Sequence, residues 1–567
     1  MLEKLRALAA SRWLYAAGAG LLLALAYPKA DVSGFAWVAP GLMLLAAMGQ
    51  TPGRAFQLGY VAGLVHWLFS LYWLLLIPVK FSPILGWLAL SAYLALYQAV
   101  WVWACWRIFP GRRVAGETAD SAGERLLALN QGERMLWALA CAVLWVAIEM
   151  LRARLLTGFP WNLLGASQHR LYPLMQVASL TGVYGLGFLV AWTSIALCLI
   201  GFARLRQPNR RAFVMSELIP QTLVLGVFWV WGASQVMPVT PAAGLPRLKI
   251  ALIQPAVPQT LIWDSRENNR RFEKLLELSR RALTNQPQVL VWPEAALPEM
   301  LRYHEPTFQA LTNLAVAHRV WLVIGSDDAE PPAGADGDAA PAYLNAAFLI
   351  SPEGRLADRY AKQHLVMFGE YVPFARWLPF LRKLTPVGEG FTPGRGPGQF
   401  EITARLAAGD LNATNDSPGE VYSINIPILI CFEDILPGLT RAAVRLDSDF
   451  ILNLTNDGWF RESAAQRQHA ANAAFRAVEN RRPLVRCTNN GQTCWFDESG
   501  CPGPMQEFYV TDRTDLYAES FRLIEIPLPD RANRVPSFYH RHGDWFGWSC
   551  VVAAALLALP LRRRPAS

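Results

Sequence analysis

Charged residues are scarce in this chain. Of its 567 residues only 17% are Asp, Glu, Lys or Arg, whereas 53% are hydrophobic. Soluble domains average about 25% charged residues, which argues against an ordinary cytosolic globular protein. The apolar content also excludes a disordered chain, because chains that stay unfolded in water contain few apolar residues.

Cysteine is sparse, and negative charge is in the minority. The 8 cysteines are too few for a small scaffold held together by disulfides. There are 52 Lys and Arg against 44 Asp and Glu, which gives a net charge of +8. A positive balance also occurs in nucleic-acid-binding proteins, but the places of the basic residues, described below, argue against nucleic acid.

Long apolar runs are what the chain has in abundance. A helix of ~20 mostly apolar residues crosses the ~30 Å hydrocarbon core of a bilayer. The run 173–203 is longer than one crossing needs, so we expect its first residues to lie along the membrane interface. Eight runs predict a polytopic α-helical membrane domain: 13–28, 32–49, 57–79, 83–106, 135–151, 173–203, 218–237 and 545–561.

The Lys and Arg residues near the predicted spans indicate their orientation. If the N-terminus lies in the cytoplasm, the cytoplasmic segments hold 16 of these residues and the short outer loops hold 5, in line with the positive-inside rule. This excess accounts for the net charge without nucleic acid, and it places the long segment from about 238 to 544 outside the cytoplasm. An alternative for residues 1–30 is a cleaved signal peptide, which would leave seven spans in the same orientation.

The segment from Arg247 to about Asp530 has a different composition. Charges return, and short β-rich runs alternate with helical stretches, which predicts an α/β domain whose sheets are covered by helices. Two stretches rich in Gly, Pro, Asp and Asn, 327–341 and 408–420, are predicted surface inserts. We expect a helix at 265–283 that Ser265 caps, a second helix at 462–481, and strands at 248–253, 288–292, 320–326, 343–350, 355–360, 424–431 and 449–454.

The domain limits follow from these patterns. We expect a transmembrane domain of seven helices at 1–237, the α/β domain at 247–530, an eighth transmembrane helix at 545–561 and a cytoplasmic tail at 562–567.

Three reactive residues lie at the ends of predicted strands of the α/β domain. Cys431 ends the run in INIPILICFED, where the backbone N–H groups of a turn can bind an oxyanion. Glu294 follows a strand in VLVWPEAALP and is a candidate general base. Lys362 lies in DRYAKQHLVMFGEYVPF, and Glu370 in the same stretch can orient it. Each has an ordinary alternative: a buried inert cysteine, a surface acid or a solvated lysine.

Taken together, these residues supply a nucleophile, a base and a cation. A neighbouring cation favours the thiolate form of a cysteine. The carboxylate can take the proton of the thiol and return it later. The combination predicts covalent acyl transfer through a cysteine.

Longer motifs resemble one known family. The chain is similar to the nitrilase superfamily with its Glu-Lys-Cys triad, and it most resembles the membrane-embedded branch of that superfamily, the apolipoprotein N-acyltransferases. The resemblance covers nearly the whole chain. It rests on WPE at 292–294, YAKQHLVMFGEYVPF at 360–374, ICFE at 430–433, NDGWF at 456–460, RPLVRCTNNG at 482–491, EMLR at 149–152, LTGFPW at 156–161 and SQ at 167–168.

The resemblance implies a nitrilase-like α-β-β-α sandwich and a role for each charged or nucleophilic residue of the site. Glu294 is then the base, Lys362 the cation that stabilises the oxyanion, and Cys431 the nucleophile. Glu370 and Glu433 match further acidic positions of the family's site.

The resemblance also implies aromatic substrate contacts. Trp263 matches an aromatic residue of the family's substrate loop. Phe432 departs from the family pattern, which often has Tyr there, so this position offers no hydroxyl. The loop that holds Trp161 lines the entry path of the lipid, or it belongs to an interfacial aromatic belt.

The implied reaction is the last step of bacterial lipoprotein maturation, with no metal and no cofactor. Cys431 takes an acyl chain from a phospholipid, commonly phosphatidylethanolamine, and forms a thioester. The α-amine of an apolipoprotein's S-diacylglyceryl-cysteine then attacks the thioester. The enzyme is expected in the bacterial inner membrane with its catalytic domain on the periplasmic side.

Two other functions remain possible on the sequence. One is a membrane-tethered amidase of the nitrilase type, for which eight spans are far more than anchoring requires. A transporter or receptor with a degenerate outer domain would have lost part of the triad, and all three residues are present.

Two further pairs of residues stand out. Glu149 and Arg152 lie at the end of a span, where intramembrane charges are functional candidates, although a structural ion pair is the favoured interpretation. Cys494 and Cys501 flank the predicted hairpin turn DESG at 497–500, so a disulfide between them is a hypothesis.

Overall fold

The computed structural model describes residues 11–110, 119–206, 211–236, 245–331, 341–375, 377, 390–406, 420–528, 531 and 534–559. The predicted tail at 562–567 and most of the two predicted inserts, namely 332–340 and 408–419, lie outside these residues. The chain divides into two compact units. Unit 1 comprises Met1–Leu75, Ile84–Val236 and Arg541–Ser567, and unit 2 comprises Leu76–Pro83 and Met237–His540.

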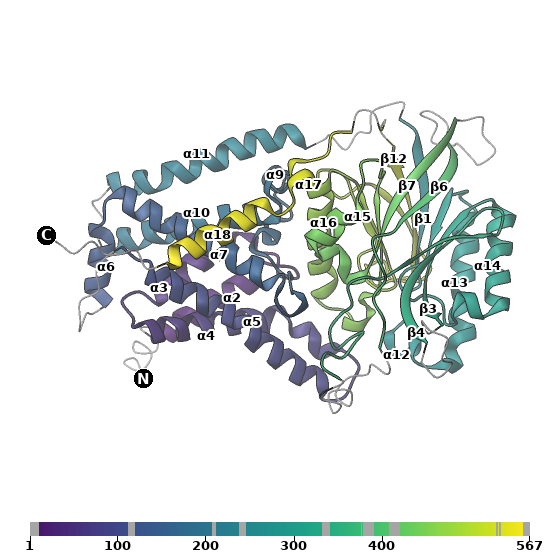
Figure 1. Ribbon diagram of the computed structural model, residues 1–567, viewed down its shortest axis with the longest axis horizontal. Helices are drawn as coiled ribbons and strands as arrows, with labels where there is room; N and C mark the ends of the chain where they lie inside the picture. The colour runs from purple at the N-terminus through teal and green to yellow at the C-terminus, as the bar shows by residue number, and fades with distance from the viewer. Residues whose placement is uncertain are drawn as a thin grey trace. The chain divides into compact units, whose positions relative to one another are not determined.

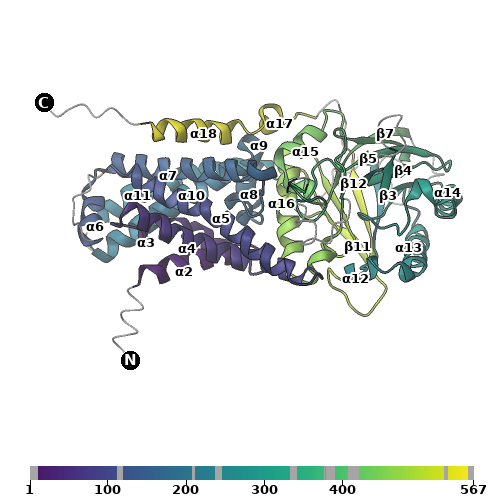
Figure 2. The ribbon, with the colours of Figure 1, turned by 60° about the horizontal axis from the view of Figure 1, so that its bottom comes forward.

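Unit 1 is built from helices that pack side by side (Figures 1 and 2). Within the described residues, three of them are long and apolar enough to cross a membrane: α5, α7 and α10. The main helices are α2 (Arg12–Leu25), α3 (Ala39–Ala46), α4 (Pro52–Ser70), α5 (Ser82–Arg107), α6 (Ala119–Ala128), α7 (Gln131–Arg152), α10 (Val183–Arg206), α11 (Arg211–Gln235) and α18 (Trp545–Ala558).

Several predicted spans are broken where the backbone leaves the helical region. The run 32–49 forms a 3₁₀ turn (Ser33–Trp37) and the short helix α3, because Val38 has φ −130° and Pro40 begins a new helix. The run 173–203 starts with two single turns, α8 (Tyr172–Met175) and α9 (Ala178–Thr181), before α10. Gly182, at φ +67°, separates α9 from α10, a conformation that glycine adopts without strain.

Unit 2 is a sandwich of two sheets between helices (Figure 1). The larger sheet has the order β11-β12-β1-β2-β3-β4-β5, and the smaller one has the order β10-β9-β8-β7-β6. Its strands are β1 (Arg247–Gln254), β2 (Val289–Val291), β3 (Trp321–Glu330), β4 (Ala342–Ile350), β5 (Leu356–Ala361), β6 (Gln399–Leu406), β7 (Glu420–Ile430), β8 (Ile451–Thr455), β9 (Leu484–Thr488), β10 (Cys494–Phe496), β11 (Met505–Tyr509) and β12 (Ser520–Pro527).

The cores of unit 2 follow from strands that are buried on both faces. In β1, Ile250 and Leu252 pack between the sheets with residues of β7 and β8, whereas Ala251 and Ile253 pack under the outer helices. The outer helices are α13 (Asn268–Leu283) and α14 (Glu305–His318) on one side, and α15 (Pro437–Ala443) and α16 (Ala465–Asn480) on the other. The layers are therefore helix, sheet, sheet, helix, as the resemblance implied.

The structure corrects several element boundaries. Ser265 is not a helix cap. Instead, the carboxylate of Asp264 accepts the N–H of Arg266 at 3.1 Å and caps a 3₁₀ turn, after which α13 begins at Asn268. The predicted insert from 327 onward is strand as far as Glu330, because the buried Asp328 is neutralised by Arg302 at 2.8 Å and by Arg359. The strands β6 and β9 to β12 were not expected.

Parallel pairing brings the ends of the central strands together. β2 is parallel to β1 and β3, and β8 is parallel to β7 and β9. The carboxyl ends of parallel strands meet at one edge of a sheet, where α/β proteins place their binding sites. Three segments leave these ends: Pro293–Glu294 after β2, Cys431 after β7, and Asn456 after β8.

Candidate active site

Cys431 is the first residue after β7. The strand ends at Ile430, one residue earlier than the sequence predicts, and a 3₁₀ turn (Cys431–Ile435) follows. Cys431 has φ +55°, a conformation that is uncommon outside glycine and is often found at functional sites. The thiol is half-buried, whereas the other seven cysteines of the chain are buried. The side-chain amide of Asn453 donates to the Cys431 carbonyl at 3.0 Å and fixes the turn to β8.

Glu294 follows β2 and is almost fully buried. Its Oε1 accepts from Asn345 Nδ2 at 2.8 Å, and its Oε2 accepts from the backbone N–H of Asn456 at 2.8 Å. Gly325 of β3 packs against this segment so closely that a Cβ there would lie 2.1 Å from the Pro293 carbonyl oxygen. The carboxylate is therefore held from both sheets.

Lys362 follows β5, with only 1% of its surface exposed. Its ammonium group lies 2.8 Å from Glu370 Oε1 and 3.3 Å from Glu294 Oε1. Burial alone would lower the pKa of Lys362, but Glu370 and Glu294 outweigh it and hold the pKa well above its usual value. Lys362 is therefore a fixed cation at neutral pH.

Glu370 and Asn345 complete the surroundings of this cation. Glu370 Oε2 accepts the Val366 N–H at 2.8 Å, which anchors the loop after Lys362. Asn345 Nδ2 lies 2.8 Å from Glu294 and 3.1 Å from Glu370, so one amide group bridges both acids. Sequence reasoning missed Asn345, although a polar residue inside the apolar strand AYLNAAFLI is a visible signal. It also missed Asn456, which acts through its backbone.

The Cys431 thiol is held in its protonated form at rest. Burial and the charge of Glu294 raise its pKa well above the usual value, while Lys362 and the Thr455 hydroxyl act in the opposite direction. These interactions bring Cys431, Glu294 and Lys362 together around one site. A carboxylate that can accept a proton, Glu294, and a cation, Lys362, therefore lie near the neutral thiol of Cys431.

Glu433 supports the site from behind and does not pair with Lys362. Its Oε2 accepts from the Tyr360 hydroxyl at 2.9 Å and from the Ile430 N–H at 2.8 Å. Its Oε1 accepts from the Gln363 and His364 N–H groups at 2.7 and 3.1 Å. Burial raises the pKa of Glu433 to about 6, although the backbone N–H groups and the charge of Lys362 act in the opposite direction. The carboxylate therefore ties the Lys362 segment to the residue before Cys431.

The three aromatic candidates lie in different surroundings. Trp263 is 47% exposed and packs edge-to-face on Trp459, with ring centroids 5.3 Å apart. Phe432 stacks on His364 at 6.0 Å. Trp161 belongs to unit 1, where it is buried against Trp73. The structure thus places Trp263 and Phe432 in the unit that holds the triad, and Trp161 in the other unit.

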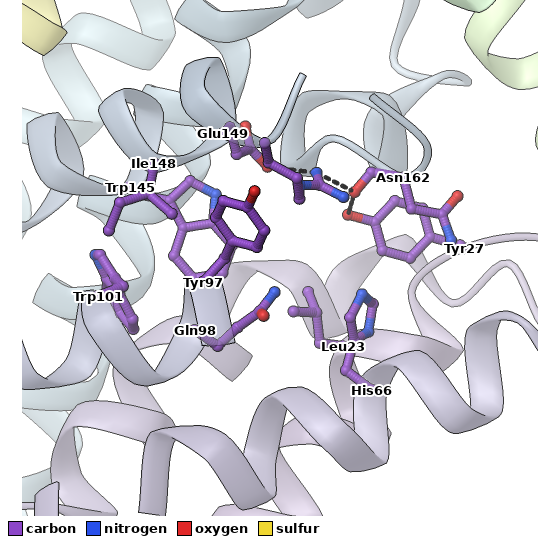
Figure 3. A pocket seen from close by; sticks show the side chains of 11 residues that line it. Leu23, Tyr27, His66, Tyr97, Gln98, Trp101, Trp145, Ile148, Glu149 and Asn162 are labelled. Atoms are coloured by element: carbon purple, nitrogen blue, oxygen red, sulfur yellow. Dashed lines mark hydrogen bonds and ion pairs between the residues drawn. The ribbon is translucent and has the colours of Figure 1, made fainter. Parts of the chain in front are cut away.

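A polar cluster inside unit 1 accounts for the predicted intramembrane charges. Arg152 pairs with Glu149 at 3.7 Å and donates to the Trp161 carbonyl at 2.8 Å. Glu149 accepts the Leu164 N–H at 2.8 Å. Glu149 and Arg152 line a cavity of about 20 Å³ that His66 also borders (Figure 3). The pair ties the end of α7 to the loop that follows, as the structural interpretation expects.

The hypothesis of a disulfide between Cys494 and Cys501 can be compared with the structure. Cys494 and Cys501 are separate, free and buried thiols, so the hypothesis of a disulfide is wrong for this structure. The hairpin register explains this result. Phe496 pairs with Pro502, and the backbone N–H of Asp497 donates to the Cys501 carbonyl, so the two cysteines do not lie opposite each other.

In the part of the chain that the structure describes, no group of three His, Cys, Asp or Glu side chains is arranged to hold a metal ion.

Comparisons with known proteins match both units. Residues 19–196 match the family model "Apolipoprotein N-acyltransferase N-terminal domain", and residues 249–517 match the model "Carbon-nitrogen hydrolase". The apolipoprotein N-acyltransferase of Geobacter metallireducens is 37% identical over 97% of this chain and 96% of its own. The enzyme of that name from Vibrio vulnificus is 30% identical over 98% and 97%.

Among solved structures, a cysteine mutant of a nitrilase-superfamily amidase from Nesterenkonia AN1 is 16% identical, with a TM-score of 0.33. It covers 51% of this chain and 92% of its own. The sequence relatives match the chain over almost its whole length. Unit 2 has the nitrilase-like fold, and the apolar helices of unit 1 are those of a membrane protein. The chain is an acyltransferase and belongs to the apolipoprotein N-acyltransferase family.

Proposed function

We propose that the chain transfers an acyl group from a phospholipid to the α-amine of the S-diacylglyceryl-cysteine of an apolipoprotein, through a thioester on Cys431. The observation that carries the proposal is the position of Lys362, which is buried between Glu294 and Glu370 at 3.3 and 2.8 Å beside the thiol. A cation that is fixed there has the place and charge to stabilise an oxyanion.

In the first half-reaction, Glu294 takes the proton of the Cys431 thiol, and the sulfur attacks the sn-1 ester carbonyl of the phospholipid. Lys362 and backbone N–H groups of the turn stabilise the tetrahedral oxyanion, an interaction worth about 3 kcal/mol per donor. The intermediate then breaks its carbon–oxygen bond. Glu294 returns the proton to the leaving alcohol, which departs as a lysophospholipid.

In the second half-reaction, the α-amine of the acceptor attacks the thioester. Glu294 accepts the amine proton, the carbon–sulfur bond breaks, and the proton returns to the Cys431 sulfur. The product is an amide, and the enzyme regains its initial state. Phosphatidylethanolamine is the donor that the family resemblance suggests, and Trp263 and Phe432 are the aromatic contacts that we assign to the substrates.

The membrane organisation belongs to the same proposal. We place eight crossings in residues 1–237 and 545–561, the catalytic domain 247–530 on the periplasmic side, and the tail in the cytoplasm of a bacterial cell. Both substrates carry acyl chains, and each buried CH₂ group contributes about 0.8 kcal/mol to keeping them in lipid. A site above the outer leaflet of the inner membrane would let these chains stay in the bilayer.

The proposal is tested with the purified full-length protein, phosphatidylethanolamine and a diacylated lipopeptide. Intact-mass spectrometry should detect one acyl group on Cys431 before the acceptor is added, and its transfer to the lipopeptide afterwards. Cys431→Ala should abolish both signals, whereas Cys487→Ala, a change at a buried cysteine of β9, should retain them. Acylation at another residue would refute the mechanism, and hydrolysis of a soluble amide without lipid would favour the amidase.

A further inference from the structure

A cluster of four buried charges lies behind the proposed nucleophile. Asp434 comes from the turn that begins at Cys431, Asp457 from the loop after β8, His469 from α16 and Arg486 from β9. All four side chains are at most 3% exposed. Neither the triad nor the four donors to Glu433 includes any of them, so the reaction described above leaves the cluster without a role.

His469 joins two carboxylates through its two ring nitrogens. Nδ1 lies 2.8 Å from Asp457 Oδ1, and Nε2 lies 2.8 Å from Asp434 Oδ1. The contact of Nδ1 is a hydrogen bond, whereas that of Nε2 is a close ion pair. In a neutral imidazole one of the two nitrogens would turn a lone pair toward a carboxylate, which is repulsive. The arrangement therefore favours the imidazolium cation.

The remaining charges around the ring are consistent with this state. Arg486 contacts Asp434 and lies 3.6 Å from Asp457, so two cations balance two anions. Burial alone would lower the pKa of His469, but Asp434 and Asp457 act more strongly than burial and Arg486 together and raise the pKa to about 9. The ring is thus charged at neutral pH.

Both partners of His469 are connected to the catalytic groups by short lengths of chain. Asp434 is the third residue after Cys431, within the same 3₁₀ turn. Asp457 follows Asn456, whose backbone N–H donates to Glu294 at 2.8 Å. Through His469, the turn that holds the sulfur and the loop that holds the base are fastened to each other.

We propose that His469, as a cation, is a positioning residue that sets the place of Cys431 relative to Glu294. The inference rests on the proposed function, in which these two groups exchange a proton. Loss of the ring proton removes one of the cations that act on the two acids, leaving Arg486 and, for Asp434, Arg476. It also turns one of the two contacts of the ring into a repulsive one. The turn and the loop then separate, and proton transfer slows.

The main test follows the first half-reaction alone, because it does not involve the titrating amine of the acceptor. The acylation rate of Cys431 is measured by intact mass at pH 7 to 10 in the wild type, His469→Gln and His540→Gln. His540 is the matched control, because it contacts Asn480 at the other end of α16 at 3.1 Å. Glutamine is neutral at every pH, and its one donor nitrogen cannot take the places of both ring nitrogens.

The wild type and His540→Gln should lose most of their acylation rate as the pH rises through about 9. His469→Gln should be slower by about 10²-fold at pH 7, the penalty expected for a misplaced reacting group, and should lack the step near pH 9. A wild-type rate that stays level or rises through pH 9, or a His469→Gln variant with the wild-type profile, would overturn the inference.

A second measurement does not need the lipid reaction. The pH dependence of Cys431 alkylation by iodoacetamide reports the apparent pKa of the thiol, with the modified peptide identified by mass spectrometry. In His469→Gln this pKa should shift away from that of the wild type, while His540→Gln should match the wild type. An unchanged pKa in folded His469→Gln would contradict the inference. If wild-type Cys431 is never acylated, the proposed function fails and the alkylation result alone decides the role of His469.

Discussion

At the scale of single residues, the structure brings together three groups that the sequence singled out, because Glu294 and Cys431 each follow an apolar run and Lys362 precedes an aromatic-rich stretch. The residues that hold them were harder to find. Asn345 acts from the middle of β4 across to both acids, and Asn456 acts through its backbone N–H. A backbone contact depends on the loop conformation and not on the amino-acid type, so the sequence carries no direct sign of it.

Replacement of Lys362 by methionine should slow the acylation of Cys431 by about 10²- to 10³-fold, the effect of removing one oxyanion donor. The initial rate of acyl-enzyme formation in detergent measures this change. Lys274→Met is the control, because Lys274 forms a half-exposed ion pair with Glu519 on the surface of unit 2. Equal rates of Cys431 acylation in the two variants would show that Lys362 does not stabilise the oxyanion.

The raised pKa of His469 also predicts how stability depends on pH. The imidazole titrates near 6.5 when unfolded and at about 9 when folded, so its stabilising effect is complete below pH 6.5 and lost as the pH rises through 9. The shift corresponds to about 3 kcal/mol. The melting temperature of the wild type should therefore fall between pH 7 and 10, and this slope should be weaker in His469→Gln. Parallel slopes would show that other groups dominate.

At the scale of elements, periodicity located most of the strands but not their ends. The run of acids in SDDAE was interpreted as an insert, yet it continues β3, because Arg302 and Arg359 reach Asp328 from distant positions. Proline and glycine explain the broken spans, since Pro40 and Gly182 sit where α3 and α10 begin. Whether such a segment continues a strand therefore depends on contacts with residues far away in the sequence, which composition alone does not show.

Asp328→Ala should destabilise unit 2 by about 2 kcal/mol, because two arginines lose a buried acceptor. The variant should also lose activity, since β3 pairs with β4 in the register that sets Asn345 opposite Asp327. Thermal unfolding and the acylation rate measure the two effects. Glu330→Ala, at the half-exposed end of the same strand, should change the melting temperature much less, and a reversed order would contradict this account.

At the scale of the whole molecule, length and composition separated a membrane part from an α/β part, and the family relatives match both. Hydropathy alone cannot give the number of membrane crossings. Apolar runs such as 32–49 fold into short pieces, and their sequence periodicity does not distinguish these pieces from one long helix.

The proposed orientation predicts which introduced cysteines react with a maleimide that cannot cross membranes. In spheroplasts, Glu353→Cys, in the exposed turn before β5, should be labelled from outside. Arg206→Cys, at the end of α10, should be labelled only after the membrane is permeabilised. The native cysteines are buried or half-buried, and the parent protein gives the background. The opposite pattern would invert the topology.

The contact between Gly325 and the Pro293 carbonyl has one more consequence. With 2.1 Å available to a β-carbon, this position admits no side chain unless the neighbouring backbone retreats, and that backbone carries Glu294. A methyl group there would push this backbone away and move the carboxylate of Glu294, the proposed base, from its place beside Cys431, although no reactive group would be lost.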